Sequence, residues 1–158
     1  MSAKTMPPPV ENLEERFQRV LEAWQRATEL PGTLPTKAAE EEQPLHEPGD
    51  RQTRLARRQA WNEIIDKPLI EWGHEAKDFE EEGIPPPSRE TLSLAGRLAA
   101  AMRDAGLSPP TRVVPDTHGG IVFEHRRDEV FETIRISSDR SIDVCHFVCG
   151  RLAHRVSI

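Results

Sequence analysis

The residues best suited to bind a metal ion lie close together near the end of the chain. They are Asp143, Cys145, His146, Cys149 and His154, and zinc binds side chains of these types. The alternation of apolar and polar residues around them predicts a strand, in which Cys145 and Cys149 point the same way but lie about 13 Å apart. That distance is too long for one metal ion or for a disulfide. We therefore expect no metal site, and we interpret both cysteines as buried or half-buried structural residues.

A second chemical reading is a metal-dependent or acid–base enzyme that uses His125, His146, Asp143 and Cys145. Adjacent residues of a strand face opposite sides of a sheet, so Glu124 and His125 do not converge. The chain also lacks the Gly-x-Ser-x-Gly, Walker and dinucleotide-binding motifs. We keep the enzyme as an alternative hypothesis, and we predict no catalytic residue and no cofactor.

The segment His118-Gly119-Gly120 has the composition of an anion-binding loop. Such loops bind anions when they lead into the N-terminus of a helix, whereas the alternating segment after Gly120 predicts a strand. The sequence therefore predicts a hairpin turn in which glycine adopts a positive φ.

Residues 88–158 have the pattern of an α+β domain, in which one amphipathic helix packs on an antiparallel meander of three to five strands. Ser88 is a suitable N-cap after a run of prolines, and Gly106 followed by Pro109 ends the helix. Between these positions, apolar residues recur every three or four places: Leu92, Ala95, Leu98, Ala99, Met102 and Ala105. Alternating segments separated by short turns then predict strands within 112–114, 121–126, 130–136 and 141–148, with a further strand or extension near Leu152.

The first half of the chain is predicted to consist of helices and linkers. We expect a disordered tail over residues 1–9, an amphipathic helix over 10–30, a flexible linker over 31–50, and a short helix with a Pro-rich connection over 51–87. Pro68 is expected to end or kink the second helix.

The candidates for partner binding are large apolar residues outside the predicted domain. They are Phe17, Val20, Leu21, Trp24, Trp61 and Trp72. The first four share one face of the 10–30 helix, which either docks on the domain as a lid or binds a partner protein. A further hypothesis is DNA binding through the Arg51–Arg58 helix, which carries four arginines.

Composition and charge narrow the choice of partners. The net charge is −6, only 36% of residues are apolar and 30% are charged. The acidic excess lies in the first half, and residues 88–158 are nearly neutral, which argues against a general nucleic-acid binder. The sequence shows no signal peptide and no apolar run of about 18 residues, so we expect a cytoplasmic protein without a membrane partner. The oligomeric state stays open.

The region from Pro85-Pro86-Pro87-Ser88 to Glu124 resembles a set of small uncharacterised bacterial proteins. Their shared pattern is a Pro-rich break, one helix, a Pro-x-x-x-Gly-Gly-x-x-x-Glu hairpin and further strands, and here the hairpin reads Pro115 to Glu124. The resemblance covers about residues 72–150. It is partial at Glu71-Trp72-Gly73-His74, where many of those proteins carry a Gly-Trp-Asp-Gly-like segment. It implies a bacterial protein of the same fold that accompanies other genes, in some cases toxin–antitoxin or mobile-element modules, and it implies no site residue.

These observations favour a non-enzymatic protein-interaction or regulatory module, of an antitoxin-like kind. The enzyme that uses the His, Cys and Asp residues of the C-terminal strands is the alternative, and DNA binding through the Arg51–Arg58 helix is the third hypothesis.

Overall fold

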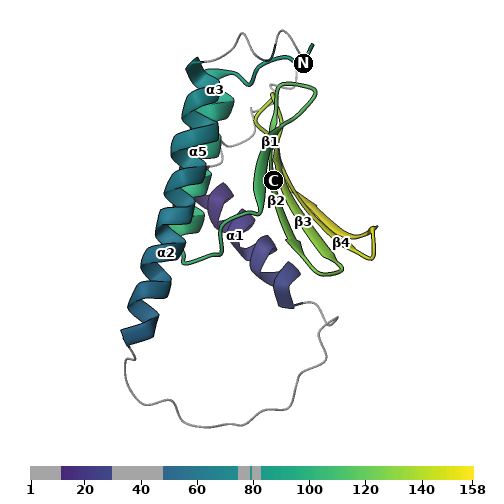
Figure 1. Ribbon diagram of the computed structural model, residues 1–158. Helices are drawn as coiled ribbons and strands as arrows, with labels where there is room; N and C mark the ends of the chain where they lie inside the picture. The colour runs from purple at the N-terminus through teal and green to yellow at the C-terminus, as the bar shows by residue number, and fades with distance from the viewer. Residues whose placement is uncertain (1–11, 30–47, 75–78, 80–82) are drawn as a thin grey trace, which may run out of the picture.

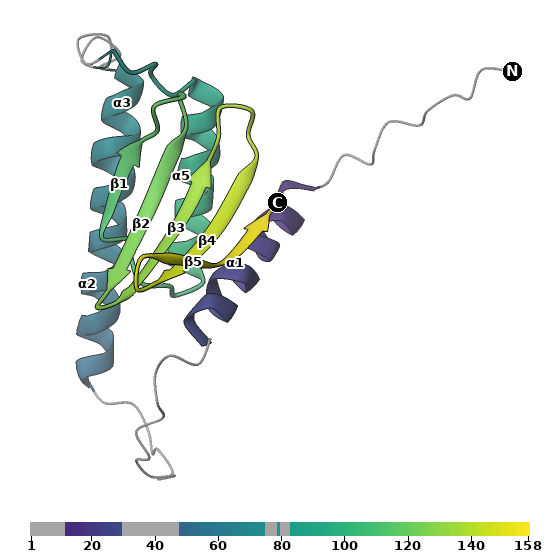
Figure 2. The same ribbon diagram turned by 90° about the vertical axis from the view of Figure 1, so that its right-hand side faces the viewer.

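The computed structural model of this protein describes residues 12–29, 48–74, 79 and 83–158. These parts form an antiparallel sheet covered by helices on one face (Figures 1 and 2), so the predicted α+β fold is confirmed. The helices are α1 (Leu13–Glu29), α2 (Pro48–Ile64), the π-helical turn η1 (Ile65–Leu69), α3 (Ile70–His74) and α5 (Arg89–Asp104). The strands are β1 (Arg112–Pro115), β2 (Ile121–Arg127), β3 (Val130–Ile136), β4 (Ile142–Val148) and β5 (Arg151–Ser157).

The five strands form a meander. They follow one another across the sheet in chain order, and each is antiparallel to the next. The register places Ile121, Ile136 and Ile142 side by side, and all three are buried on the face that the helices cover. Because side chains alternate between the two faces of a strand, the intervening residues point to the opposite face. Figure 2 shows that face without a helix in front of it.

Helix α5 begins and ends at the residues that the sequence predicts. The hydroxyl oxygen of Ser88 accepts a hydrogen bond of 3.1 Å from a backbone N–H of the first turn. At the other end, Gly106 has a φ of 75°. The N–H groups of Gly106 and Leu107 donate to the carbonyls of Arg103 and Met102, each over 3.0 Å. This is the Schellman arrangement, in which glycine supplies the left-handed residue that ends the helix.

Helices α2, α5 and α1 lie side by side behind the sheet in Figure 2. Helices α5 and α1 pack on the sheet, and α2 packs on α5. One hydrophobic core connects them, with buried side chains that include Phe17, Val20, Trp24, Trp61, Leu98, Met102, Phe123 and Ile134. The core therefore extends beyond residues 88–158, because α1 and α2 contribute large side chains to it.

Helices α2 and α3 are joined by η1 into one continuous helical run from Pro48 to His74. The prediction that Pro68 ends the helix is wrong, because Pro68 lies inside η1 and the helical run continues beyond it. The alternative, a kink at Pro68, stays a prediction. The wider π-helical turn accommodates a residue that has no N–H to donate. The predicted linker also ends earlier than residue 50, since α2 begins at Pro48, and proline suits the first turn of a helix.

The predicted tail over residues 1–9 and the linker residues 31–47 lie outside the described residues. In the parts of the chain that the structure describes, no helix has both the length and the apolar character needed to cross a membrane.

Candidate functional site

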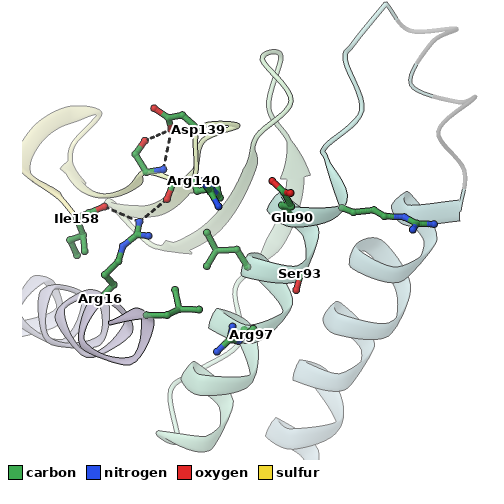
Figure 3. Close-up of a pocket in the computed structure, with 11 residues that line it drawn as sticks. Arg16, Glu90, Ser93, Arg97, Asp139, Arg140 and Ile158 are labelled. Atoms are coloured by element: carbon green, nitrogen blue, oxygen red, sulfur yellow. Dashed lines mark hydrogen bonds between the residues drawn. The ribbon is translucent and has the colours of Figure 1, made fainter. Parts of the chain in front are cut away.

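A groove of about 750 Å³ opens between α1, the first half of α5 and the β3–β4 turn (Figure 3). Apolar side chains of Leu13, Leu94 and Ile158 form part of its lining. They come from α1, from α5 and from the end of the chain after β5. We call this hollow the α1–α5 groove.

The charged lining of the α1–α5 groove is mainly basic. It consists of the arginines Arg16, Arg89, Arg97 and Arg140 and the carboxylates Glu90 and Asp139. The guanidinium of Arg16 donates to the carbonyls of Arg140 and Ile158 over 2.6 and 3.3 Å, which fixes α1 against the sheet (Figure 3). The Asp139 carboxylate accepts hydrogen bonds from the hydroxyl and the N–H of Ser141 over 2.7 and 3.0 Å. These bonds lower the pKa of Asp139 and keep the carboxylate within its own turn.

Two arginines on α5 remain available to a ligand. Arg89 and Arg97 are exposed, and neither forms an ion pair with another described residue. Some other surface arginines are paired with carboxylates, as Arg155 is with Asp143 over 2.9 Å. An arginine guanidinium binds carboxylates with two parallel hydrogen bonds. The α1–α5 groove can therefore bind an oxyanion beside an apolar group.

No local pattern in the sequence predicts this groove. Its residues come from segments that are far apart in the chain, such as Arg16 and Arg140. The local signal was a polar stripe on α5, where Arg89, Ser93 and Arg97 recur every four residues.

A row of three titratable side chains lies on the covered face of the sheet. The register aligns His125 on β2 with Glu132 on β3, and Glu132 with His146 on β4, and all three are buried. The Nδ1 atom of His146 lies 3.2 Å from Oε1 of Glu132. Burial raises the pKa of Glu132, and the neighbouring His146 opposes that rise only in part.

His125 completes this row beneath α1. Its Nδ1 atom has no hydrogen-bond partner among the described residues, and its ring meets that of Trp24 edge-on with 5.8 Å between the centroids. Burial lowers the pKa of His125, with a further contribution from Arg127. The imidazole is therefore neutral at pH 7. Because Trp24 covers it, His125 belongs to the packed core rather than to an open site.

The enzyme hypothesis requires His125, His146, Asp143 and Cys145 to converge. The structure places the two histidines on the covered face and the other two residues on the opposite face, because positions alternate along β4. Burial alone would raise the pKa of Asp143, but hydrogen bonds from Arg155 and from a serine on β5 outweigh it and lower the pKa. Among the described residues, no group of three or more His, Cys, Asp or Glu side chains is arranged to hold a metal ion.

The two cysteines differ in exposure. Cys145 is half-buried, as predicted, but Cys149 is exposed. The prediction for Cys149 is wrong because this residue lies in the β4–β5 turn, where its φ is 49°. Its thiol donates to the Glu129 carboxylate over 3.3 Å, and this hydrogen bond raises the pKa of Cys149. The thiol is therefore protonated and is not an activated nucleophile.

The six residues predicted to bind a partner lie in or beside the core. Phe17, Val20, Trp24 and Trp61 are buried, and Leu21 and Trp72 are half-buried. The indole N–H of Trp61 donates to the carbonyl of Leu107 over 2.8 Å, and Trp72 packs edge-on against Phe79. In this conformation α1 is docked on the sheet, which corresponds to the lid interpretation. A partner would meet the buried face of α1 only after the helix had left the core.

The segment His118-Gly119-Gly120 forms part of the turn between β1 and β2, as predicted. Gly119 has a φ of 77°. A Cβ atom on Gly120 would lie 2.5 Å from the carbonyl oxygen of Ile136. The close approach of two strands therefore explains this glycine without a bound anion.

Comparisons with protein-family models, with curated proteins and with solved structures find no match for this chain. The resemblance to small bacterial proteins with a Pro-rich break and a Gly-Gly hairpin stays a prediction.

Proposed function

We propose that this protein is a non-enzymatic protein-interaction module whose α1–α5 groove binds a segment of a partner protein that carries acidic and apolar side chains. A regulatory, antitoxin-like role in the bacterial cytoplasm is part of this proposal. The observation that supports it is the exposure of Arg89 and Arg97, without a carboxylate partner among the described residues, beside an apolar surface.

The apolar part of the groove supports a peptide rather than a small anion as the ligand. Leu13 and Ile158 are partly buried and Leu94 is buried, so an apolar side chain of the partner would remove their remaining exposed surface from water. The arginines at the rim would pair with flanking carboxylates, which adds specificity and speeds association more than it adds affinity.

The alternatives have less geometric support. The catalytic set of the enzyme hypothesis is divided between the two faces of the sheet. Partner binding through Phe17 and Trp24 requires α1 to undock, and this exposes side chains whose burial contributes about 1.5–3 kcal/mol each. The groove is accessible without any such change.

Fluorescence anisotropy with labelled synthetic dodecapeptides tests the proposal. One peptide repeats Leu-Glu-Glu, and a second repeats Leu-Gln-Gln. We expect only the acidic peptide to bind, and we expect the double variant R89E/R97E to weaken its binding about tenfold or more, because each substitution replaces an attraction with a repulsion.

The matched control is R126E/R151E, which makes the same change in charge at two exposed arginines outside the groove. Equal loss of binding in the two double variants would show that net charge, not the groove, determines affinity. That result, or equal binding of the two peptides, would contradict the proposal.

A further inference from the structure

The first turns of α2 extend beyond the rest of the helical layer. In Figures 1 and 2 this end of α2 runs past the ends of α5 and of the sheet. All side chains from residue 51 to residue 59 are exposed, and Leu55 is 58% exposed. This end of the helix is therefore accessible on several sides.

The exposed end of α2 is strongly basic. It carries Arg51, Arg54, Arg57 and Arg58, and no acidic residue occurs between residues 51 and 62. At 100° per residue, the four arginines lie within an arc of about 120° that also contains the direction of Trp61. Trp61 packs towards α5. The face of α2 that packs on α5 therefore continues beyond the end of α5, where it carries the arginines.

A hollow of about 270 Å³ lies at the step between the two helices. Its lining includes Arg54, Arg57, Arg58, Trp61 and Arg103. We call this hollow, together with Arg51, the basic notch.

The basic notch contains two groups that would repel an anion, the carbonyl end of α5 and the carboxylate of Asp104, and arginines compensate both. The C-terminal end of a helix is unfavourable to anions, but Arg57 donates to the carbonyl of Gly106 at the end of α5 over 3.2 Å. Asp104 also lines the notch, and a hydrogen bond from Arg103, with a smaller effect of Arg58, lowers the pKa of Asp104. Arg103 and Arg57 thus compensate local negative charge, and Arg51 and Arg58 add a positive charge beyond that requirement.

From this geometry we infer that the basic notch and the projecting end of α2 bind the phosphate backbone of duplex DNA. Arg51 and Arg58 are about 10 Å apart along the helix axis, so together they can contact more than one phosphate of a strand. A helix is about 10–12 Å wide, which fits the major groove of B-DNA. Gln52 and Gln59 add uncharged side chains that can hydrogen-bond to the sugar–phosphate backbone.

The net charge of −6 does not set the local charge of this segment. Five acidic residues lie between residues 40 and 50, whereas residues 51–62 carry four arginines and no acidic side chain. Binding of this kind is independent of base sequence and depends strongly on salt, since it releases counterions from DNA. The site is distinct from the α1–α5 groove, which has a different lining.

The test measures binding of the full chain to a fluorescein-labelled random-sequence duplex of about 20 base pairs, between 50 and 200 mM NaCl. We expect affinity to fall as salt rises. In the variant R51Q/R58Q, we expect weaker binding at every salt concentration and a logarithmic salt slope lower by about 2, because each phosphate contact contributes about 0.9 to that slope. The control R126Q/R151Q should retain the wild-type slope. Far-ultraviolet circular dichroism verifies that each variant is folded.

Three outcomes would overturn the inference. The first is absence of binding at 50 mM NaCl, and the second is an equal change in slope for R51Q/R58Q and for the control. The third is that poly-glutamate displaces the labelled duplex as effectively as unlabelled DNA does, when the two competitors are compared at equal concentrations of negative charge. The basic notch would then bind carboxylates as readily as phosphates, and an acidic protein would fit it instead.

Discussion

The buried Glu132–His146 pair constrains the sheet at the level of single residues. A buried hydrogen bond between two polar side chains adds little net stability, because both groups lose their hydrogen bonds to water. A shift of β3 by one residue would move Glu132 to the uncovered face and would leave His146 buried without its partner. Because a buried polar group without a hydrogen-bond partner is costly, the pair disfavours such a shift. The pair therefore contributes to register more than to stability.

His125 makes the stability of the protein dependent on pH. Its pKa in the folded state is lowered from the ordinary value of 6.5, so below that pH the unfolded chain binds a proton that the folded chain does not. The contribution of His125 is therefore fully present above pH 6.5, and it decreases as the pH falls, by at most about 1.4 kcal/mol per pH unit. The charged groups near the ring are Arg127 on its own strand and Glu132 on β3, and α1 contributes the neutral ring of Trp24.

Urea unfolding of the wild type and of His125→Phe, from pH 7.5 to pH 5, tests this expectation. Glu132 titrates in both proteins, and its raised pKa makes stability increase as the pH falls, which is opposite to the effect of His125. The difference in stability between the two proteins therefore isolates the contribution of His125. The wild type should lose stability relative to His125→Phe below pH 6.5. His154→Gln, at an exposed position on β5, should follow the wild type. A constant difference between wild type and His125→Phe over this range would contradict the assignment.

At the scale of the elements, two glycines with different surroundings show where a side chain can be added. Gly96 lies within α5, and a Cβ atom there would meet no atom within 4 Å. Gly96→Ala should therefore stabilise the protein by about 0.5–1 kcal/mol, because alanine favours the helix.

Gly120→Ala should destabilise the protein by about 1–3 kcal/mol, because the added Cβ would force β2 away from Ile136. Thermal or urea unfolding measures both changes, and equal effects would show that the turn relaxes freely.

At the scale of the whole molecule, the sequence predicts what local signals determine. Ser88 and Gly106 set the ends of α5, and alternation sets the first four strands, so these elements are predicted correctly. The sequence left the last segment open between an extension of the fourth strand and a fifth strand, and the structure has β5. The passage of the helix through Pro68 was not predictable from proline geometry, because it depends on a π-helical turn. The α1–α5 groove and the pairing of Glu132 depend on contacts between distant segments and on strand register, and neither is visible in a local pattern.

The extent of the core leads to a prediction about cooperativity. The chain has three tryptophans and no tyrosine, and Trp24, Trp61 and Trp72 all precede residue 83. Tryptophan fluorescence therefore reports on α1, α2 and α3, whereas the strand band of the infrared amide I spectrum reports on the sheet. Since Trp24 and Trp61 belong to the same core as the sheet residues, we expect both signals to change at the same urea concentration, as in a two-state transition. If the fluorescence changed at a lower urea concentration than the strand band, residues 88–158 would be an autonomous domain to which the first half is only loosely attached. In that case the α1–α5 groove would lose the α1 wall before the sheet unfolds, and its occupation by a partner would stabilise α1 selectively.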